Sequence, residues 1–331
     1  HRTGRLMKTP RFWQSRNLIS TLLAPASAAY ALGAWADRHF TTPRRAPIPV
    51  ISVGNVTAGG AGKTPTTLTL VPMLQALGHT PHILIRGYKS AARPAPHRVT
   101  EQDDWRDVGD EALLLSARAP TGVGRNRLAS AHAAASAGAT ILLCDDALQH
   151  HALYKNISLL VIDGSYGLGN GRLLPAGPLR ESLAVGLMRS HGVVMIGPDI
   201  HQLAETITIP VLTATLQPDG DMGFLREHRW LAFAGIARPE KFFTSARQAG
   251  ADIVATRTFA DHHAYSDAQL SALMREADAM GARLLTTSKD AVKIPAHRRA
   301  SIAVLPVALA FTNPAYVSDF LSSRLNASRL P

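Results

Sequence analysis

The stretch Pro49-Val-Ile-Ser-Val-Gly-Asn-Val-Thr-Ala-Gly-Gly-Ala-Gly-Lys-Thr64 decides the fold of this 331-residue chain. Its first six residues read as a buried strand, and the residues from Lys63 to Leu77 read as the helix that follows. A strand, a glycine-rich turn, Lys-Thr and a helix form the arrangement that wraps backbone N–H groups around a phosphate. Lys63 would neutralise charge on the β- and γ-phosphates of a nucleotide, and the Thr64 hydroxyl would hold Mg²⁺.

The phosphate-loop pattern is imperfect at one position, because its strict form has Gly where this chain has Thr57. The strand before the loop and the helix after it nevertheless fit. The predicted phosphate-binding residues are Thr57, Ala58, Gly59, Gly60, Ala61, Gly62, Lys63 and Thr64.

A second nucleotide feature is expected at the end of another strand, and Thr140-Ile-Leu-Leu-Cys-Asp-Asp146 supplies it. Apolar strand residues that end in a carboxylate place Asp145 and Asp146 beside the phosphate loop, where they can hold Mg²⁺ directly or through water. The alternative is that the two acids cap the next helix.

Short apolar runs alternate with helix-like segments from Pro47 onward. This alternation predicts an α/β fold with a parallel sheet and helices on both of its faces. A Pro-Asp-Gly-Asp turn at 218–221 reads as a connection to a smaller α/β unit. We therefore expect an N-terminal segment over residues 1–46, a phosphate-loop core over 47–225 and a smaller C-terminal domain over 226–331.

The composition and the distribution of charge indicate which kind of partner the protein has. With 46% apolar and 18% charged residues the chain is globular, and its one cysteine, Cys144, excludes an intramolecular disulfide. The net charge of +11 is uneven, because residues 1–47 carry eight basic side chains against the single carboxylate of Asp37, a net charge of +7. A uniformly basic surface would suggest nucleic acid. A basic segment that flanks apolar residues favours an anionic membrane surface instead.

The basic segment encloses a charge-free run of 20 residues, Asn17–Ala36. Its length would suit a membrane span, but Pro25, Gly33 and several hydroxyl side chains dilute the apolar residues. Three interpretations stay open: a helix in the membrane interface, a true span, or an amphipathic helix packed on the domain. We expect the interfacial helix.

Six further motifs follow the phosphate loop in a fixed order. They are Arg86-Gly-Tyr88, Val108-Gly-Asp-Glu-Ala112, Asp145-Asp-Ala-Leu-Gln-His150, Gly169-Asn-Gly-Arg-Leu-Leu-Pro-Ala-Gly-Pro-Leu-Arg-Glu181, Phe259-Ala-Asp-His-His-Ala-Tyr265 and Thr286-Thr-Ser-Lys-Asp-Ala-Val-Lys293. With the phosphate loop, this set resembles the tetraacyldisaccharide 4′-kinase family of Gram-negative lipid A synthesis, from about Pro10 to Ile294.

The resemblance implies an enzyme that uses ATP and Mg²⁺ to phosphorylate the 4′-hydroxyl of a tetraacylated glucosamine disaccharide 1-phosphate, giving lipid IVA. It implies a peripheral or monotopic position on the cytoplasmic face of the inner membrane, and an active site in a cleft between two domains. No nucleic acid and no protein partner are indicated. By the same resemblance, Asp110 and His262 match the catalytic pair and Arg180 a basic residue near the transferred phosphate. The acids expected near Mg²⁺ are Glu111, Asp145, Asp146 and Glu181.

The chemistry agrees with this assignment, because a sugar hydroxyl needs a positioned base to accept its proton. Rival readings are a GTPase or partition-type ATPase, and a membrane adaptor with a dead nucleotide fold. The chain lacks Asn-Lys-x-Asp, has Ala58 where a partition ATPase has Lys, and keeps the acids that an adaptor would lose. Zinc at His150 and His151 is not expected, since adjacent histidines chelate one metal poorly.

Three departures from the family pattern and one Lys-Asp pair complete the sequence analysis. Ile85, Lys89 and Ala147 depart from the family pattern, and at 147 the usual glycine would permit a positive φ. Lys289-Asp290 is interpreted as a structural pair at the surface.

Overall fold

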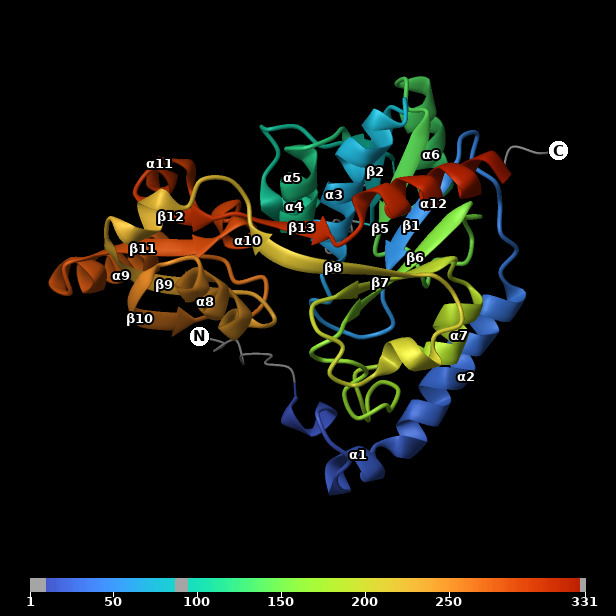
Figure 1. Cartoon of the computed structure of the whole chain (residues 1–331), viewed down its shortest axis with the longest axis horizontal. Helices are drawn as coiled ribbons and strands as arrows, with labels where there is room; N and C mark the ends of the chain where they lie inside the picture. The colour runs from blue at the N-terminus through green and yellow to red at the C-terminus, as the bar shows by residue number, and fades with distance from the viewer. Residues whose placement is uncertain (1–9, 87–94, 328–331) are drawn as a thin grey trace. The chain divides into compact units, whose positions relative to one another are not determined.

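The computed structural model describes residues 10–86 and 95–327, which form two units (Figure 1). Of these residues, the larger unit contains 10–216 and 309–327, and the smaller unit contains 217–308. Gly87 and Tyr88 of the Arg-Gly-Tyr motif, and the unusual Lys89, lie outside the described residues.

This division differs from the expected boundary at residue 226 and from a C-terminal domain that reaches residue 331. The chain leaves the larger unit after Leu216 and returns to it at Leu309. It returns because the last helix carries apolar side chains, among them Val317, Phe320 and Leu321, that are buried in the core of the larger unit. Residues 10–46, expected as a separate segment, also belong to this unit.

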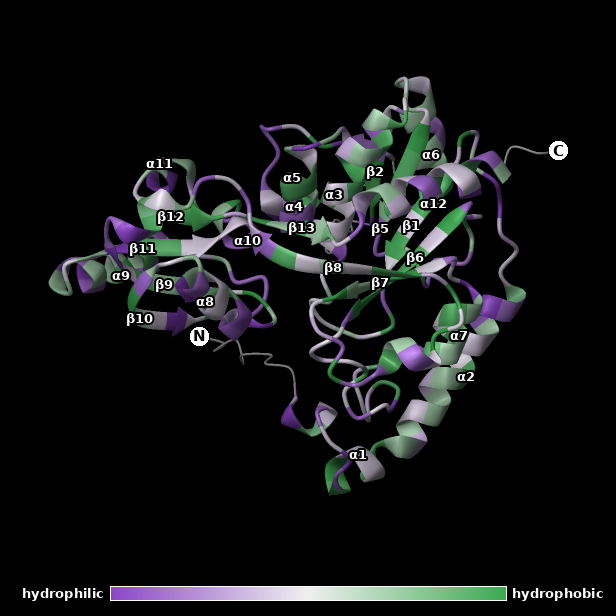
Figure 2. Cartoon of the chain, viewed as in Figure 1, coloured by the Kyte–Doolittle hydropathy of each residue, from purple (hydrophilic) through white to green (hydrophobic). Residues whose placement is uncertain are grey.

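A nine-stranded sheet forms the centre of the larger unit in the described part of the chain, in the order β13-β8-β7-β6-β1-β5-β2-β4-β3. The pairs from β8 through β4 are parallel, and β3 pairs antiparallel to β4. The strands are β1 (Val50–Gly54), β2 (Pro81–Ile85), β3 (His97–Arg98), β4 (Thr121–Val123), β5 (Ile141–Asp145), β6 (Ile157–Asp163), β7 (Gly192–Ile196), β8 (Val211–Pro218) and β13 (Val307–Phe311). The central strands are fully buried and largely hydrophobic (Figure 2), as the alternating pattern predicts.

Helices cover both faces of this sheet. The side chains of α3, α5 and α12 pack in one apolar cluster, whereas α6 and α7 contribute to clusters formed by the opposite strand positions. The helices of the larger unit are α1 (Leu18–Leu22), α2 (Ala24–Phe40), α3 (Lys63–Ala76), α4 (Trp105–Val108), α5 (Asp110–Ser116), α6 (Arg127–Ser136), α7 (Leu183–Met188) and α12 (Pro314–Ala327). The parallel strands therefore end on one edge, where their carboxyl-terminal loops gather.

The smaller unit is a parallel sheet of order β10-β9-β11-β12 with α8 and α9 on opposite faces. Its elements are β9 (Arg229–Ala234), α8 (Pro239–Gln248), β10 (Asp252–Thr258), α9 (Asp267–Ala279), β11 (Ala282–Thr287), α10 (Ser288–Ala291), α11 (Ala296–Arg299) and β12 (Ile302–Leu305). The interpretation of Lys289-Asp290 as a surface pair is wrong for Asp290. Its side chain is fully buried and pairs with Lys293, three residues further on.

The charge-free run forms α1 and most of α2, and the two helices meet at Leu23. Leu18, Leu22, Leu32 and Phe40 are 65–76% exposed, although they are strongly apolar. The buried Ser27 fastens α2 to the loop before Arg180, since its hydroxyl donates to Leu173 O at 2.8 Å and accepts from Ala176 N at 3.1 Å. Among the described residues, no helix combines the length and hydropathy that crossing a membrane requires.

Candidate active site

The phosphate loop connects β1 to α3 as predicted. Gly59 and Gly62 have φ values of 110° and 93°, which side chains with a Cβ rarely adopt. Gly62 is also the residue immediately before α3, so the backbone N–H groups of the first turn of α3 face the loop. The loop thus has the backbone of an anion-binding turn at a helix N-terminus.

The side chain of Lys63 lies across the phosphate loop. Its Nζ donates to Asn55 Oδ1 at 3.1 Å and lies 3.7 Å from Asp146 Oδ1. Asn55 is fully buried and in turn donates to Thr57 O at 2.6 Å. Sequence reasoning missed Asn55, although its place directly after the first strand and its carboxamide were available as signals.

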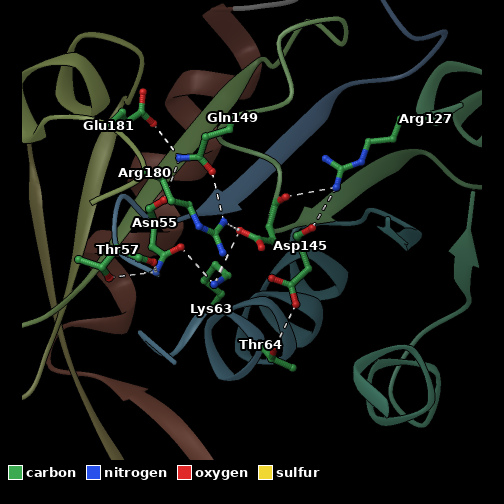
Figure 3. Close-up of polar contacts among 10 residues, drawn as sticks. Asn55, Thr57, Lys63, Thr64, Arg127, Asp145, Gln149, Arg180 and Glu181 are labelled. Atoms are coloured by element: carbon green, nitrogen blue, oxygen red, sulfur yellow. Dashed lines mark hydrogen bonds and ion pairs between the residues drawn. The ribbon is translucent and has the colours of Figure 1, made fainter. Parts of the chain in front are cut away.

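Thr64 and Asp145 meet at the start of α3. The Thr64 hydroxyl donates to Asp145 Oδ2 at 3.0 Å (Figure 3), which confirms that the end of β5 lies beside the phosphate loop. This pairing of a loop hydroxyl with a strand-end carboxylate is the arrangement that holds Mg²⁺ in phosphate-loop enzymes.

The carboxyl group of Asp145 is held in an unfavourable environment. Burial, followed by the negative charge of Glu111, raises its pKa to about 7 against the opposing effect of Lys63. Glu111 therefore lies near enough to Asp145 for its charge to act on this carboxyl, and the role of the two acids at Mg²⁺ stays a prediction. A strongly perturbed carboxyl in such a place is typical of a functional site.

Asp146 is shared by two cations. Arg180 Nη1 lies 2.8 Å from Asp146 Oδ1, the same oxygen that faces Lys63. Burial opposes the charge of Asp146, but Lys63 and Arg180 outweigh burial and hold the pKa of this carboxyl below its usual value. The positive φ of this turn is at Asp146, with a value of 51°, and not at Ala147. Ala147 therefore adopts a turn that needs no glycine.

Glu181 is part of a polar network next to Arg180. Its Oε1 accepts from Gln149 Nε2 at 2.7 Å, and its Oε2 is paired with Arg189. Gln149 also donates to Asn55 O at 2.9 Å, so the network reaches back to the phosphate loop. Sequence reasoning gave no role to Arg189. Because both Glu181 oxygens already have partners, the structure favours Asp145 over Glu181 as a metal ligand.

A buried guanidinium contacts the backbone oxygens of Asp145 and Asp146. Arg127 is 3% exposed, and its Nη2 donates to Asp146 O at 3.2 Å. Burial lowers the pKa of Arg127 despite the nearby Cys144 and Asp146. The sequence analysis gave Arg127 no role. The signal was available, since it is the only Lys or Arg in an otherwise Ala-rich helix.

Asp110 is the first residue of α5 and is 5% exposed. Gly109 precedes it with a φ of 95°, and the Glu111 N–H donates to Asp110 Oδ1 at 2.9 Å. Because Glu111 is near Asp145, the same turn brings Asp110 to the strand edge that carries the phosphate loop.

His262 lies in the smaller unit, in the loop between β10 and α9. Its φ of 57° is in the left-handed region, which is uncommon for a residue other than glycine. Its Nε2 is 3.8 Å from Asp261 Oδ2, and Asp261 Oδ1 is 3.9 Å from Lys289 Nζ. Backbone strain of this kind is concentrated at functional positions.

The residues present fit a magnesium ion bound together with phosphates. The Oδ1 atom of Asp145 is buried and has no hydrogen-bond partner within the described ranges 10–86 and 95–327. In the same ranges no cluster of three or more His, Cys, Asp or Glu side chains could hold a metal alone. Mg²⁺ at nucleotide sites takes only one or two carboxylates and fills its remaining positions with phosphate and water, so Thr64 and Asp145 suffice.

Fold and site together define a phosphate-loop nucleotide-binding protein with a cationic pair, Lys63 and Arg180, next to a strand-end carboxylate. The chain belongs to the tetraacyldisaccharide-1-P 4′-kinase family, whose sequence model matches residues 19–326. This confirms the resemblance inferred from the ordered motifs.

Curated relatives cover nearly the whole chain. It is 44% identical over 316 residues to a tetraacyldisaccharide 4′-kinase of Paramagnetospirillum magneticum, covering 94% of this chain and 97% of that one. It is 46% identical to the enzyme of that name from Jannaschia sp., covering 92% and 94%. The crystal structure of LpxK from Aquifex aeolicus in complex with ATP has the same fold, with a TM-score of 0.74 at 23% identity, covering 93% of this chain and 100% of that one.

Proposed function

We propose that this protein transfers the γ-phosphate of ATP to the 4′-hydroxyl of a tetraacylated glucosamine disaccharide 1-phosphate, giving lipid IVA. One observation carries the proposal: Thr64, next to Lys63 on the phosphate loop, contacts Asp145 at the end of β5 in a chain that belongs to this kinase family. The fold and the family exclude a purely structural reading of the glycine-rich turn.

Lys63 and Arg180 bind and orient the phosphates. Both cations face the same carboxylate oxygen of Asp146. The negative charge of this oxygen keeps the two positive charges close together until a phosphate binds. A transferring phosphoryl group spreads negative charge over its oxygens, and fixed cations stabilise that charge in the transition state. Asn55 holds Lys63 from the protein side, so its ammonium group is positioned before the nucleotide binds.

Magnesium would be held by Thr64 and Asp145, with Glu111 nearby. When bound, the ion neutralises phosphate charge and aligns the β- and γ-phosphates. The buried, unpartnered Oδ1 atom of Asp145 supports this role within the described residues.

Asp110 and His262 are proposed as the groups that act on the acceptor. Asp110 would take the proton of the 4′-hydroxyl, and His262 would set the basicity of that carboxylate. Asp110 belongs to the larger unit and His262 to the smaller unit. The buried position of Asp110 and the strained backbone of His262 support the assignment.

The lipid acceptor suggests where the enzyme works. We propose that α1 and α2 lie in the interface of an anionic bilayer on the cytoplasmic face of the inner membrane, with their exposed Leu and Phe side chains in the headgroup region. Arg11 and Arg16 precede these helices, Arg38 lies in the last turn of α2, and Arg44 and Arg45 follow it. Because Ser27 fastens α2 to the loop that leads to Arg180, membrane contact and phosphate binding would be close together.

Phosphate transfer in mixed micelles tests the proposed function. The purified protein, labelled ATP and tetraacyldisaccharide 1-phosphate should give a labelled lipid, and Lys63→Met should lower its formation at least ~100-fold. ADP release without a labelled lipid in the wild-type protein would reject the proposal and favour a hydrolytic switch.

A further inference from the structure

The loop that carries His262 is fastened at both ends to the core of the smaller unit. At its start, the Phe259 N–H donates to Ala234 O at 2.9 Å. At its end, the Tyr265 hydroxyl donates to Asp290 Oδ1 at 2.9 Å. His262 lies midway between these two attachments.

Asp290 is the centre of the second attachment. Its Oδ1 accepts from Tyr265 and lies 2.8 Å from Lys293 Nζ. Its Oδ2 accepts from the Gly235 N–H at 3.0 Å and from the Thr287 hydroxyl at 2.7 Å. Both oxygens of a fully buried carboxylate are therefore satisfied, which is the condition under which such a charge is tolerated in a core.

Tyr265 lies in the loop that carries His262, and its hydroxyl contacts Asp290. Burial, followed by the charge of Asp290, raises the pKa of Tyr265 well above its usual value, so the phenol stays protonated and remains a donor. Its ring packs against Phe233 and Phe259, with ring centroids 5.3 and 5.2 Å apart. The hydroxyl therefore adds a directional link to a ring that is already packed.

Gly235 brings the end of β9 into the same small space. A Cβ at this position would lie 2.9 Å from the Tyr265 hydroxyl oxygen, 3.0 Å from Ala260 O and 3.1 Å from Asp290 Oδ1. The strand end, the loop and the carboxylate are thus packed more closely than any residue other than glycine would permit.

We infer that Asp290, acting through Tyr265, is a positioning residue that holds the backbone of His262 in its left-handed conformation. That conformation costs free energy, and it persists only where its surroundings fix it on both sides. A buried ion pair alone is weak grounds for a functional role, because such a pair also occurs in cores. The decisive feature is that one of the donors to Asp290 lies three residues from His262 in the loop. The inference rests on the proposed role of His262.

A double-variant experiment tests this inference. Tyr265→Phe removes the hydroxyl and keeps the packed ring, and it should lower kcat for phosphate transfer about 10-fold with KM for ATP unchanged. In a His262→Ala background the same substitution should have no further effect, because the loop then has no imidazole to position. Tyr316→Phe, on the exposed part of α12, is the matched control and should match the wild-type protein.

The outcomes are distinguishable. If Tyr265→Phe lowers kcat by the same factor with and without His262, its effect does not act through His262 and the inference is wrong. Full activity of Tyr265→Phe in the wild-type background also overturns it. Full activity of His262→Ala overturns both this inference and the proposed role of His262, whereas failure of the wild-type protein to transfer phosphate overturns the proposed function. Asp290→Asn, checked by circular dichroism, should reproduce the kcat loss of Tyr265→Phe; a folded Asp290→Asn with full kcat contradicts the inference.

Discussion

The raised pKa of Asp145 leads to a prediction about the free energy of unfolding. Its pKa is raised from 3.8 to about 7, a preference for the neutral form of about 4 kcal/mol. Because the pKa in the folded protein exceeds that in the unfolded chain, the folded protein binds the extra proton between these two pH values. The stabilising contribution of protonated Asp145 is therefore fully present below about pH 4 and is lost as the pH rises through 7. Asp145→Asn removes the titrating group and retains most of the shape of the side chain.

In EDTA, we expect the free energy of unfolding of the wild-type protein to fall by about 3 kcal/mol more than that of Asp145→Asn between pH 5 and pH 8. Urea unfolding followed by circular dichroism at both pH values measures this difference. At pH 8 the variant should be the more stable protein, although it has lost a proposed magnesium ligand. Parallel changes in the two proteins would refute the reasoning, since they would mean that Asp145 is already charged in the folded state at pH 5.

Two further predictions concern catalysis and the membrane. Asp110→Asn and His262→Ala should each lower kcat at least ~100-fold with ATP affinity retained, and the double variant should be no slower than the slower single variant, because the two groups act as a unit. Additive losses in transfer assays would argue that they act separately. Replacing Leu18, Leu22 and Leu32 by Ser should reduce cosedimentation with phosphatidylglycerol vesicles at least ~10-fold, whereas Met188→Ser should not. Equal binding of both proteins would contradict interfacial binding by α1 and α2.

Local sequence signals were sufficient to predict the phosphate loop. The glycine spacing, Lys63, Thr64 and the run of apolar residues before Asp145 each have a short-range physical cause, and the structure places Thr64 against Asp145 as expected. Asp110 and His262 came from the resemblance to a family, and their pairing stays a prediction.

Long-range features could not be predicted in the same way. The return of the chain at Leu309 to the larger unit depends on where α12 finds an apolar surface, and nothing in its own sequence specifies that surface. Asp290 was misread because a Lys-Asp pair in sequence is usually exposed, whereas here the partner is Lys293 in the core. Arg127 gains its role from the backbone oxygen of Asp146, and Asn55 gains its role from the ammonium group of Lys63 and the side-chain amide of Gln149.

The site of phosphorylation on the product tests the central claim most directly. After incubation with ATP and tetraacyldisaccharide 1-phosphate, the lipid product can be examined by ³¹P–¹H correlation spectroscopy. The proposed function predicts a second phosphate whose phosphorus couples to the proton on the 4′ carbon, and none of this product with Lys63→Met. A phosphate at any other hydroxyl, or an unchanged lipid accompanied by ADP, would contradict it.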